Sequence, residues 1–291
     1  MNRTRTSLLQ IPRRVPSQSA RRRKRVYVTL RVIALGLFVV FFVGPILWMI
    51  LTSFKETADV VDPSKIFVFS PTLDNFAKAI SQQNFGLFAW NSLFVASAAT
   101  GMSLVIGLPA AYAIARFRMM KSVAGILIAR ALPGISLLVP WYFIFFNLGL
   151  TNGYVALLLA HMFIALPLIV WILWSFFNNL PEELEEAAQV DGLTAIGAFA
   201  RIAVPLARSG IATAVILSFI FSWNNFMFTL VLADSGATTL PVAVYNFIGY
   251  AAVDWGGLMA ASLIVTMPIA IITLFTQKYI VSGLTGGATK G

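Results

Sequence analysis

The chain has little charge for its length. Only 11% of its 291 residues are charged, whereas 59% are apolar. A soluble domain carries roughly 25% charged residues, so this chain has too few to cover a water-facing surface. Because lipid offers exposed backbone no hydrogen-bond partner, and because the apolar runs are long and unbroken, we expect an all-α membrane protein. A transmembrane barrel would show short alternating strands instead.

Further absences exclude several chemistries. The chain has no cysteine, which rules out disulfides, thiol nucleophiles, iron–sulfur clusters and thiolate metal sites. The single histidine, His161, cannot form a multi-histidine metal site. No P-loop pattern G-x-x-x-x-G-K-[ST] occurs, so ATP is not bound by that route. We therefore expect no catalytic residues, no metal and no cofactor in this chain, which is not predicted to be an enzyme.

Six segments are apolar and long enough to cross a membrane as helices, at about 20 residues per span. Only the third contains a charged residue, Arg130, and its Pro133-Gly134 and Pro140 are expected to kink the helix and widen a cavity. The six predicted spans are residues 32–51, 88–115, 122–148, 154–177, 210–233 and 258–276.

The net charge of +10 is distributed asymmetrically along the chain. Lysine and arginine number 17 in the segments on one predicted side of the membrane and 3 on the other. Since positive segments remain cytoplasmic, both termini and the loops 116–121 and 178–209 are predicted to lie inside. Residues 1–30 form a basic, disordered tail that favours anionic lipid, with DNA binding as the alternative. The membrane domain then covers 31–280, followed by a cytoplasmic tail over 281–291.

The spans offer no carboxylate for ion coupling. All eleven acidic residues lie in loops or at their edges. Proton- and sodium-driven transporters usually need acidic groups within the membrane. A transport protein of this composition therefore depends on an external motor, or it is passive.

The 178–209 loop carries strong helix signals. Pro181 suits the first turn of a helix, and Glu182 and Glu183 then lie at the positive end of its dipole. Gly192 suits a helix C-terminus that requires positive φ, and a second helix can begin at Thr194. Two short helices with apolar and acidic faces favour docking of a partner; a loop packed on the membrane surface is the alternative.

The spacing within this loop resembles a known motif. Glu186-Ala187-Ala188 is followed by three residues, Gly192, nine residues, Ile202, one residue and Val204-Pro205, as in the EAA motif of ABC-importer permeases. The chain is similar to the carbohydrate branch of that family, closest to the MalG-like group of second maltose-permease subunits. Further similar segments are Leu180-Pro181-Glu182-Glu183-Leu184, Ser222-Trp223-Asn224-Asn225-Phe226, Leu240-Pro241-Val242, Asp254-Trp255-Gly256 and the tail from Gly283 to Gly291.

The resemblance implies a fold and a set of partners. It implies a type I ABC-importer permease in the bacterial inner membrane, paired with a second, homologous permease. Two ATPase subunits, which hold the ATP and magnesium, dock on the EAA loop, and an extracytoplasmic binding protein delivers substrate. The residues implied in ATPase docking are Glu182, Glu183, Glu186, Ala187, Ala188, Asp191, Gly192, Phe199, Ile202 and Pro205.

Polar and aromatic residues within the spans are candidates for the substrate pathway. Asn224 and Asn225 are expected on the fifth helix, where amides suit sugar hydroxyls or, alternatively, bond neighbouring helices. His161 is a pathway candidate or a contact within the bundle. Arg130 can snorkel, pair with an acid of the partner permease or line water. The remaining candidates, which could present ring faces to a sugar, are Trp141, Tyr142 and Trp223.

The leading hypothesis is a translocation subunit of an ATP-driven sugar importer. The alternatives are a permease for a polyol, glycerol phosphate or sulfonated sugar, and a passive channel or scaffold. A channel would be favoured by rings of charge or a carbonyl filter pattern, and the sequence shows neither.

Overall fold

The computed structural model describes residues 18–82, 84–151, 153–249 and 253–285. Most of the predicted basic tail and the last six residues therefore lie outside the described residues. Within these ranges the secondary structure is helical, apart from one isolated β-bridge between Ile248 and Val253, so the all-α prediction is confirmed. The chain divides into two units, Met1–Leu51 and Thr52–Gly291, which are considered separately.

The first unit consists largely of one helix, α1 (Gln18–Ser53). Its segment Val26–Ser53 is long and apolar enough to cross a membrane, and it contains the first predicted span. The helix continues through Pro45 without a break.

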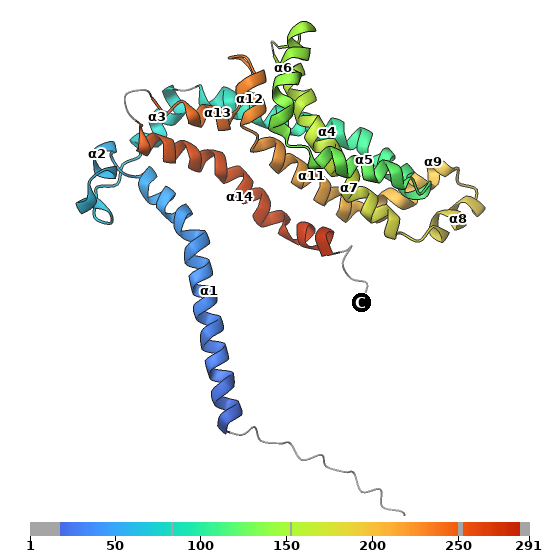
Figure 1. The fold of residues 1–291 in the computed structure, drawn as a ribbon, viewed down its shortest axis with the longest axis horizontal. Coiled ribbons are helices and arrows are strands. Elements are labelled where there is room, and N and C mark those ends of the chain that lie inside the picture. The colour runs from blue at the N-terminus through green and yellow to red at the C-terminus, as the bar shows by residue number, and fades with distance from the viewer. Residues whose placement is uncertain (1–17, 83, 152, 250–252, 286–291) are drawn as a thin grey trace, which may run out of the picture. The chain divides into compact units, whose positions relative to one another are not determined.

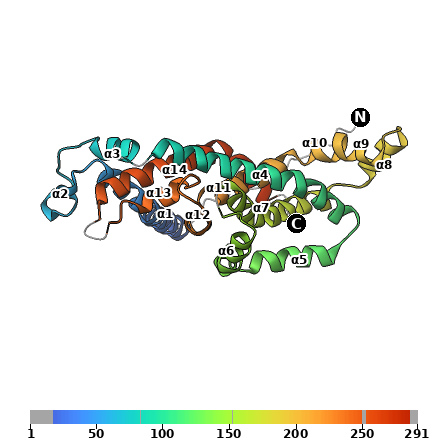
Figure 2. The ribbon, with the colours of Figure 1, turned by 90° about the horizontal axis from the view of Figure 1, so that it is seen from above.

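Four helices form the framework of the second unit. α4 (Phe85–Arg116), α7 (Tyr154–Asn179) and α11 (Arg208–Trp223) pack against one another, and α14 (Trp255–Thr285) packs against α11. Figures 1 and 2 show these helices side by side. The predicted second, fourth and sixth spans fall within α4, α7 and α14.

Small residues allow these helices to approach closely. A Cβ at Gly107 of α4 would lie 2.9 Å from Cγ2 of Ile169 in α7, and one at Gly210 of α11 would lie 2.5 Å from the ring of Phe176. In a bilayer, where lipid is as apolar as leucine, such close packing stabilises helix pairs. The buried residues along this contact are Ala111, Ala115, Leu173, Phe177, Ala203, Ala207 and Ala214.

The third predicted span is broken in its middle. α5 (Met120–Ala131) ends before Pro133, and the chain resumes as η2 (Gly134–Leu137) and α6 (Leu138–Asn147) at a bend of 88°. Proline disfavours helical geometry in the residue before it, and Leu132 is extended at ψ 125°. The kink expected at Pro133-Gly134 is thus confirmed, whereas α6 continues through Pro140.

The fifth predicted span is also shorter than expected. α11 ends at Trp223, and α12 (Met227–Leu232) forms a separate short helix. The segment Ala195–Leu206 precedes α11 at a bend of 73°. The described residues hold four helices that could each cross a membrane, and six spans when each bent pair counts as one.

Short elements occupy one end of the second unit. They are α2 (Thr57–Val60), η1 (Pro63–Lys65), α3 (Asp74–Gln82) and α13 (Leu240–Tyr245). Asn75 Nδ2 donates to the carbonyls of Ser53 and Lys55, at 2.9 and 2.7 Å. Asn91 Nδ2 likewise donates to two carbonyls of the loop before α13. In Figure 2, α3 and α13 lie at the end of the bundle opposite α8 and α9.

Candidate functional site

The 178–209 loop, called the coupling loop from here on, begins with a well-terminated helix. α8 (Glu183–Val190) is followed by Gly192 at φ 96°, so the predicted positive φ is confirmed. The Leu193 N–H donates to the Ala188 carbonyl and the Gly192 N–H to that of Gln189, both at 3.0 Å. This is the Schellman pattern that glycine permits. Pro181 precedes the helix rather than lying in its first turn.

A second helical segment begins where the sequence predicts. Thr194 Oγ1 accepts a hydrogen bond from the Gly197 N–H at 3.1 Å and caps α9 (Ala195–Ala198). The helix then passes through a π-helical turn, η3 (Phe199–Ala203), and ends in α10 (Val204–Leu206). The coupling loop is therefore two helical segments joined at Gly192, and Figure 1 shows them at one end of the bundle.

A buried ionic contact fixes α8 to the transmembrane bundle. Glu185 is 5% exposed and accepts hydrogen bonds from the Tyr112 hydroxyl and from Nε and Nη2 of Arg116, both in α4. Arg116 Nη1 also donates to the carbonyls of Phe177 at 2.9 Å and Leu180 at 3.4 Å. We call this group the Glu185 anchor. It joins the last turn of α4, the end of α7 and the first turn of α8.

Aromatic packing extends the anchor to the second helix of the loop. The Tyr112 ring lies 4.6 Å from that of Phe199 and 5.5 Å from that of Phe177, centroid to centroid. Phe199 is half-buried, and Ala198 and Ala203 beside it are fully buried. Both helices of the coupling loop are therefore held against the same end of α4 and α7.

The side chains of the loop that face away from the Glu185 anchor include exposed apolar and acidic residues. Val190 is 88% exposed and Ile196 80%, with no large side chain covering either. The acidic residues Glu182, Glu183, Glu186 and Asp191 are exposed as well. Of the other predicted docking residues, Ala187, Gly192 and Pro205 are exposed, Ile202 is half-buried and Ala188 is buried.

The anchor was not anticipated from the sequence. Glu185 is one of three glutamates in α8, and the motif spacing points to its neighbour Glu186 instead. One feature of the sequence indicates that Glu185 could be buried: it lies three residues before Ala188, which places both on one helix face. In the structure they are the two buried residues of α8.

The polar candidates of the fifth span form hydrogen bonds with residues close to them in the sequence. The expectation that Asn224 and Asn225 lie within a helix is wrong, because α11 ends at Trp223. Asn224 Nδ2 donates to the Ile220 carbonyl, and Asn225 Oδ1 accepts from the Phe228 N–H at the start of α12. The buried Trp223 donates from Nε1 to the Val265 carbonyl of α14 at 3.2 Å.

The remaining candidates lie between α6, α7 and α11. His161 is 2% exposed, and its Nδ1 lies 2.6 Å from the Ser222 hydroxyl. Trp141 packs edge-on against Phe163 and stacks on Phe228. Tyr142 is exposed and stacks on Phe146.

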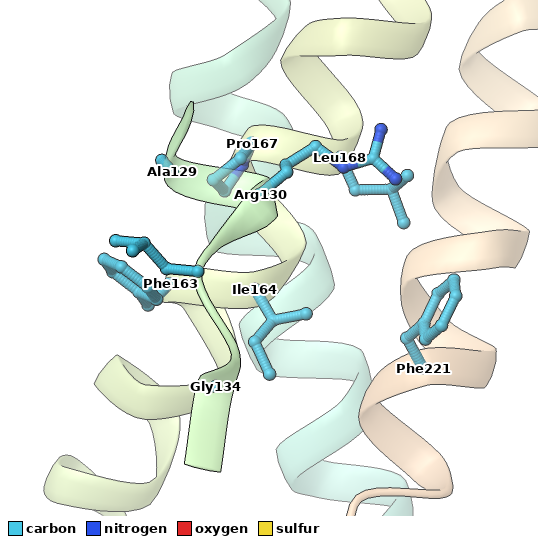
Figure 3. A pocket seen from close by; sticks show the side chains of 9 residues that line it. Ala129, Arg130, Gly134, Phe163, Ile164, Pro167, Leu168 and Phe221 are labelled. Carbon is cyan, nitrogen blue, oxygen red and sulfur yellow. The ribbon is translucent and has the colours of Figure 1, made fainter. Parts of the chain in front are cut away.

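A cavity of about 240 Å³ lies where α5 breaks, between α5, α7 and α11. Arg130 lies on its wall (Figure 3), beside Phe163, Ile164, Pro167 and Phe221. The structure brings Arg130 close to α7 and α11, but it does not join Arg130 to the asparagines. Among the described residues, no group of three or more histidine or acidic side chains could hold a metal ion.

Several long apolar helices define a multi-pass membrane protein. Residues 103–286 match the family described as the binding-protein-dependent transport system inner membrane component. The chain belongs to this family, since the match covers more than half of its length. The resemblance inferred from the EAA spacing is thereby confirmed.

Curated relatives align over most of the chain. The sulfoquinovosyl glycerol transport system permease SmoH of Agrobacterium fabrum is 38% identical, over 90% of this chain and 94% of the relative. The trehalose transport system permease SugB of Mycobacterium tuberculosis is 37% identical, over 85% and 92%. A crystal structure of a bacterial ABC transporter involved in alginate import has the same fold, with a TM-score of 0.75, 19% identity and coverage of 91% and 99%.

Proposed function

We propose that this protein is a translocation subunit of an ATP-driven, binding-protein-dependent saccharide importer in the bacterial inner membrane. It forms the pathway together with a homologous second permease. The curated relatives support saccharide as the substrate class, since they are named for trehalose, trehalose/maltose and diacetylchitobiose transport. Both termini and the coupling loop face the cytoplasm in this proposal.

The observation that carries the proposal is the two-sided coupling loop. One side is fixed to α4 and α7 by the Glu185 anchor and by Phe199. The other side exposes Val190 and Ile196 together with acidic residues. Exposed apolar and acidic side chains on two short helices suit docking into a groove of a partner. Two ATPase subunits, which bind the ATP and magnesium, are the partners we assign to this surface and its equivalent on the second permease.

A rigid loop of this kind transmits motion. Because α8 is tied to α4 and α7 through buried hydrogen bonds, a displacement of the docked ATPase moves those helices with it. The energy of nucleotide binding thus reaches the spans without any nucleotide site in this chain. Substrate would pass between this bundle and that of the second permease.

The alternative to a neutral sugar as the substrate is a charged or reduced relative of a sugar. SmoH is named for sulfoquinovosyl glycerol, a sulfonated glycoside. This alternative leaves the fold, the loop and the partners unchanged.

Cross-linking of single cysteines tests the docking surface. The chain has no cysteine, so one placed at Val190 or Ile196 is unique within it. In the assembled complex, each should cross-link to an ATPase subunit through a short bifunctional reagent. Val61→Cys is the matched control, since Val61 is also apolar and exposed but belongs to the predicted external segment. Cross-linking of Val61 but not of the loop positions would refute the assignment.

A further inference from the structure

Arg130 is the one charged residue within the six predicted spans. It lies ten residues after the start of α5, which is about 15 Å along the helix axis. A guanidinium at that depth is costly unless it pairs or lines a polar space. The dipole of α5 favours a cation at its C-terminus, but it supplies no acceptors for five N–H donors.

Within the part of the chain that the structure describes, no ion pair involves Arg130. The ion pairs found there join Lys65 with Asp59, Arg116 with Glu185 and Arg118 with Glu182. Figure 3 shows the Arg130 side chain extending from the end of α5 toward Leu168, on the side of α11 and Phe221. The guanidinium thus lies on the wall of the cavity, and none of the described acidic residues forms an ion pair with it.

The walls of the cavity suit a sugar ring. Its volume is about 240 Å³, and Phe163, Ile164, Pro167 and Phe221 line it beside Arg130. Aromatic faces contact the C–H surfaces of sugars, and a guanidinium binds sulfonate, phosphate or carboxylate through paired hydrogen bonds. The break before Pro133 keeps the chain of α5 from closing the space. Transporters commonly place substrate sites at such broken helices.

A second space adjoins this cavity and carries polar groups, but it is too small to admit a water molecule. Ile164 and Phe221 line both spaces, and the second also contains His161, Ser218 and Asn225. The buried Nε2 of His161 and the buried hydroxyl of Ser218 have no hydrogen-bond partner within the described residues. Buried polar atoms without partners are rare and costly. Because no water-sized group fits between them, the larger cavity beside Arg130 is the space that can take a ligand.

We infer that the cavity beside Arg130 forms a subsite for an anionic saccharide, with its acidic group on Arg130 and its ring against Phe163 and Phe221. This inference rests on the proposed function and names the substrate class within it. It differs from two other uses of Arg130: pairing with an acid of the second permease, and snorkelling to lipid phosphate. Neither use calls for a cavity with aromatic walls beside the guanidinium.

Uptake into proteoliposomes by the assembled complex, with its binding protein supplied, tests the subsite. The probes are sulfoquinovosyl glycerol and glucosyl glycerol, which differ by a sulfonate in place of one hydroxyl. Arg130→Gln should lower uptake of the sulfonated probe by about tenfold to a hundredfold, because charge-assisted hydrogen bonds are lost. Arg130→Lys should retain most of that uptake. Lys121→Gln, which removes a charge from the exposed first turn of the same helix, should leave it unchanged.

The outcomes separate this inference from the proposed function. If the unaltered complex moves glucosyl glycerol with ATP but not the sulfonated probe, the anionic subsite is refuted and the proposed function stands. Equal uptake by the unaltered complex and Arg130→Gln refutes the subsite and favours snorkelling. A parallel loss of the second permease from purified Arg130→Gln complex refutes it in favour of a partner carboxylate. If neither probe is moved and ATP hydrolysis does not respond to loaded binding protein, the proposed function itself fails.

Discussion

Glu185→Ala should release the coupling loop from the bundle. The substitution removes the acceptor of three hydrogen bonds and leaves Arg116, whose side chain is 12% exposed, with only the carbonyls of Phe177 and Leu180. Breaking a buried ion pair by removing one partner costs about 3–5 kcal/mol. Since Arg116 keeps two acceptors, we expect the lower value, about 3 kcal/mol, which is roughly a hundredfold shift in the population of the docked loop.

The adjacent glutamate provides a matched control. Glu186 is exposed and has no partner in the anchor, so Glu186→Ala should cost about 0–1 kcal/mol at most. Tyr112→Phe removes a single hydrogen bond and keeps the ring contacts with Phe177 and Phe199. It should fall between the two, at about 1 kcal/mol.

Amide hydrogen exchange in the 183–206 segment measures this opening directly. Glu185→Ala should raise exchange across α8 and α9 while α7 stays protected. A double-mutant cycle with Arg116→Met should give a coupling energy above about 1 kcal/mol, because the two residues act as one unit. If Glu185→Ala exchanges like Glu186→Ala, or if the two mutations add without coupling, the anchor does not hold the loop.

Gly192, the predicted topology and Asn225 each offer a separate test. The Gly192→Asp variant should insert normally but lose ATPase association and transport, because φ 96° strains any residue with a Cβ. The control is Gly149→Ala, which is strained at φ 67° but lies outside the coupling loop and should retain both. Full transport by Gly192→Asp would show that the loop does not couple the ATPase. Cysteines at Ser64 and Gly236 should react with an impermeant maleimide from outside sealed cells while one at Gln189 should not, so outside labelling of Gln189 would overturn the topology. Asn225→Ala should lower the free energy of unfolding by about 0.5–1.5 kcal/mol, because the Phe228 N–H loses the Asn225 Oδ1 as its acceptor. Asn224→Ala should be nearly neutral, since Asn224 is exposed; unchanged stability of both variants would show that the Asn225 hydrogen bond contributes nothing.

Local signals in the coupling loop could be predicted from sequence. Gly192 and Thr194 act within a few residues of their own positions, through a positive φ and a capped N–H. The Glu185 anchor could not be predicted in this way. Its partner Arg116 is 69 residues away, and their contact depends on how α4, α7 and α8 pack. A loop glutamate and an arginine at the end of a span both look solvated when each is considered by itself.

In the spans, too, some features could be predicted from the sequence and others could not. Long apolar runs predicted α4, α7 and α14, because burial in lipid requires about 20 apolar residues. The apolar run 210–233 gave no sign of the helix end at Trp223, because hydropathy does not indicate that Asn225 accepts a hydrogen bond from the Phe228 N–H. The cavity beside Arg130 depends on the break at Pro133 and on the neighbouring helices. The sequence predicted the kink, but only the structure shows which helices enclose the space.

Stimulated ATP hydrolysis by the reconstituted complex tests the central claim most directly. A Val190→Asp, Ile196→Asp double variant places two charges on exposed apolar positions of the coupling loop and leaves the Glu185 anchor intact. The account predicts that the two permeases still assemble, while saccharide-loaded binding protein no longer stimulates ATP hydrolysis or uptake. Stimulation equal to that of the unaltered complex would contradict the claim that this surface couples the ATPase to the membrane spans.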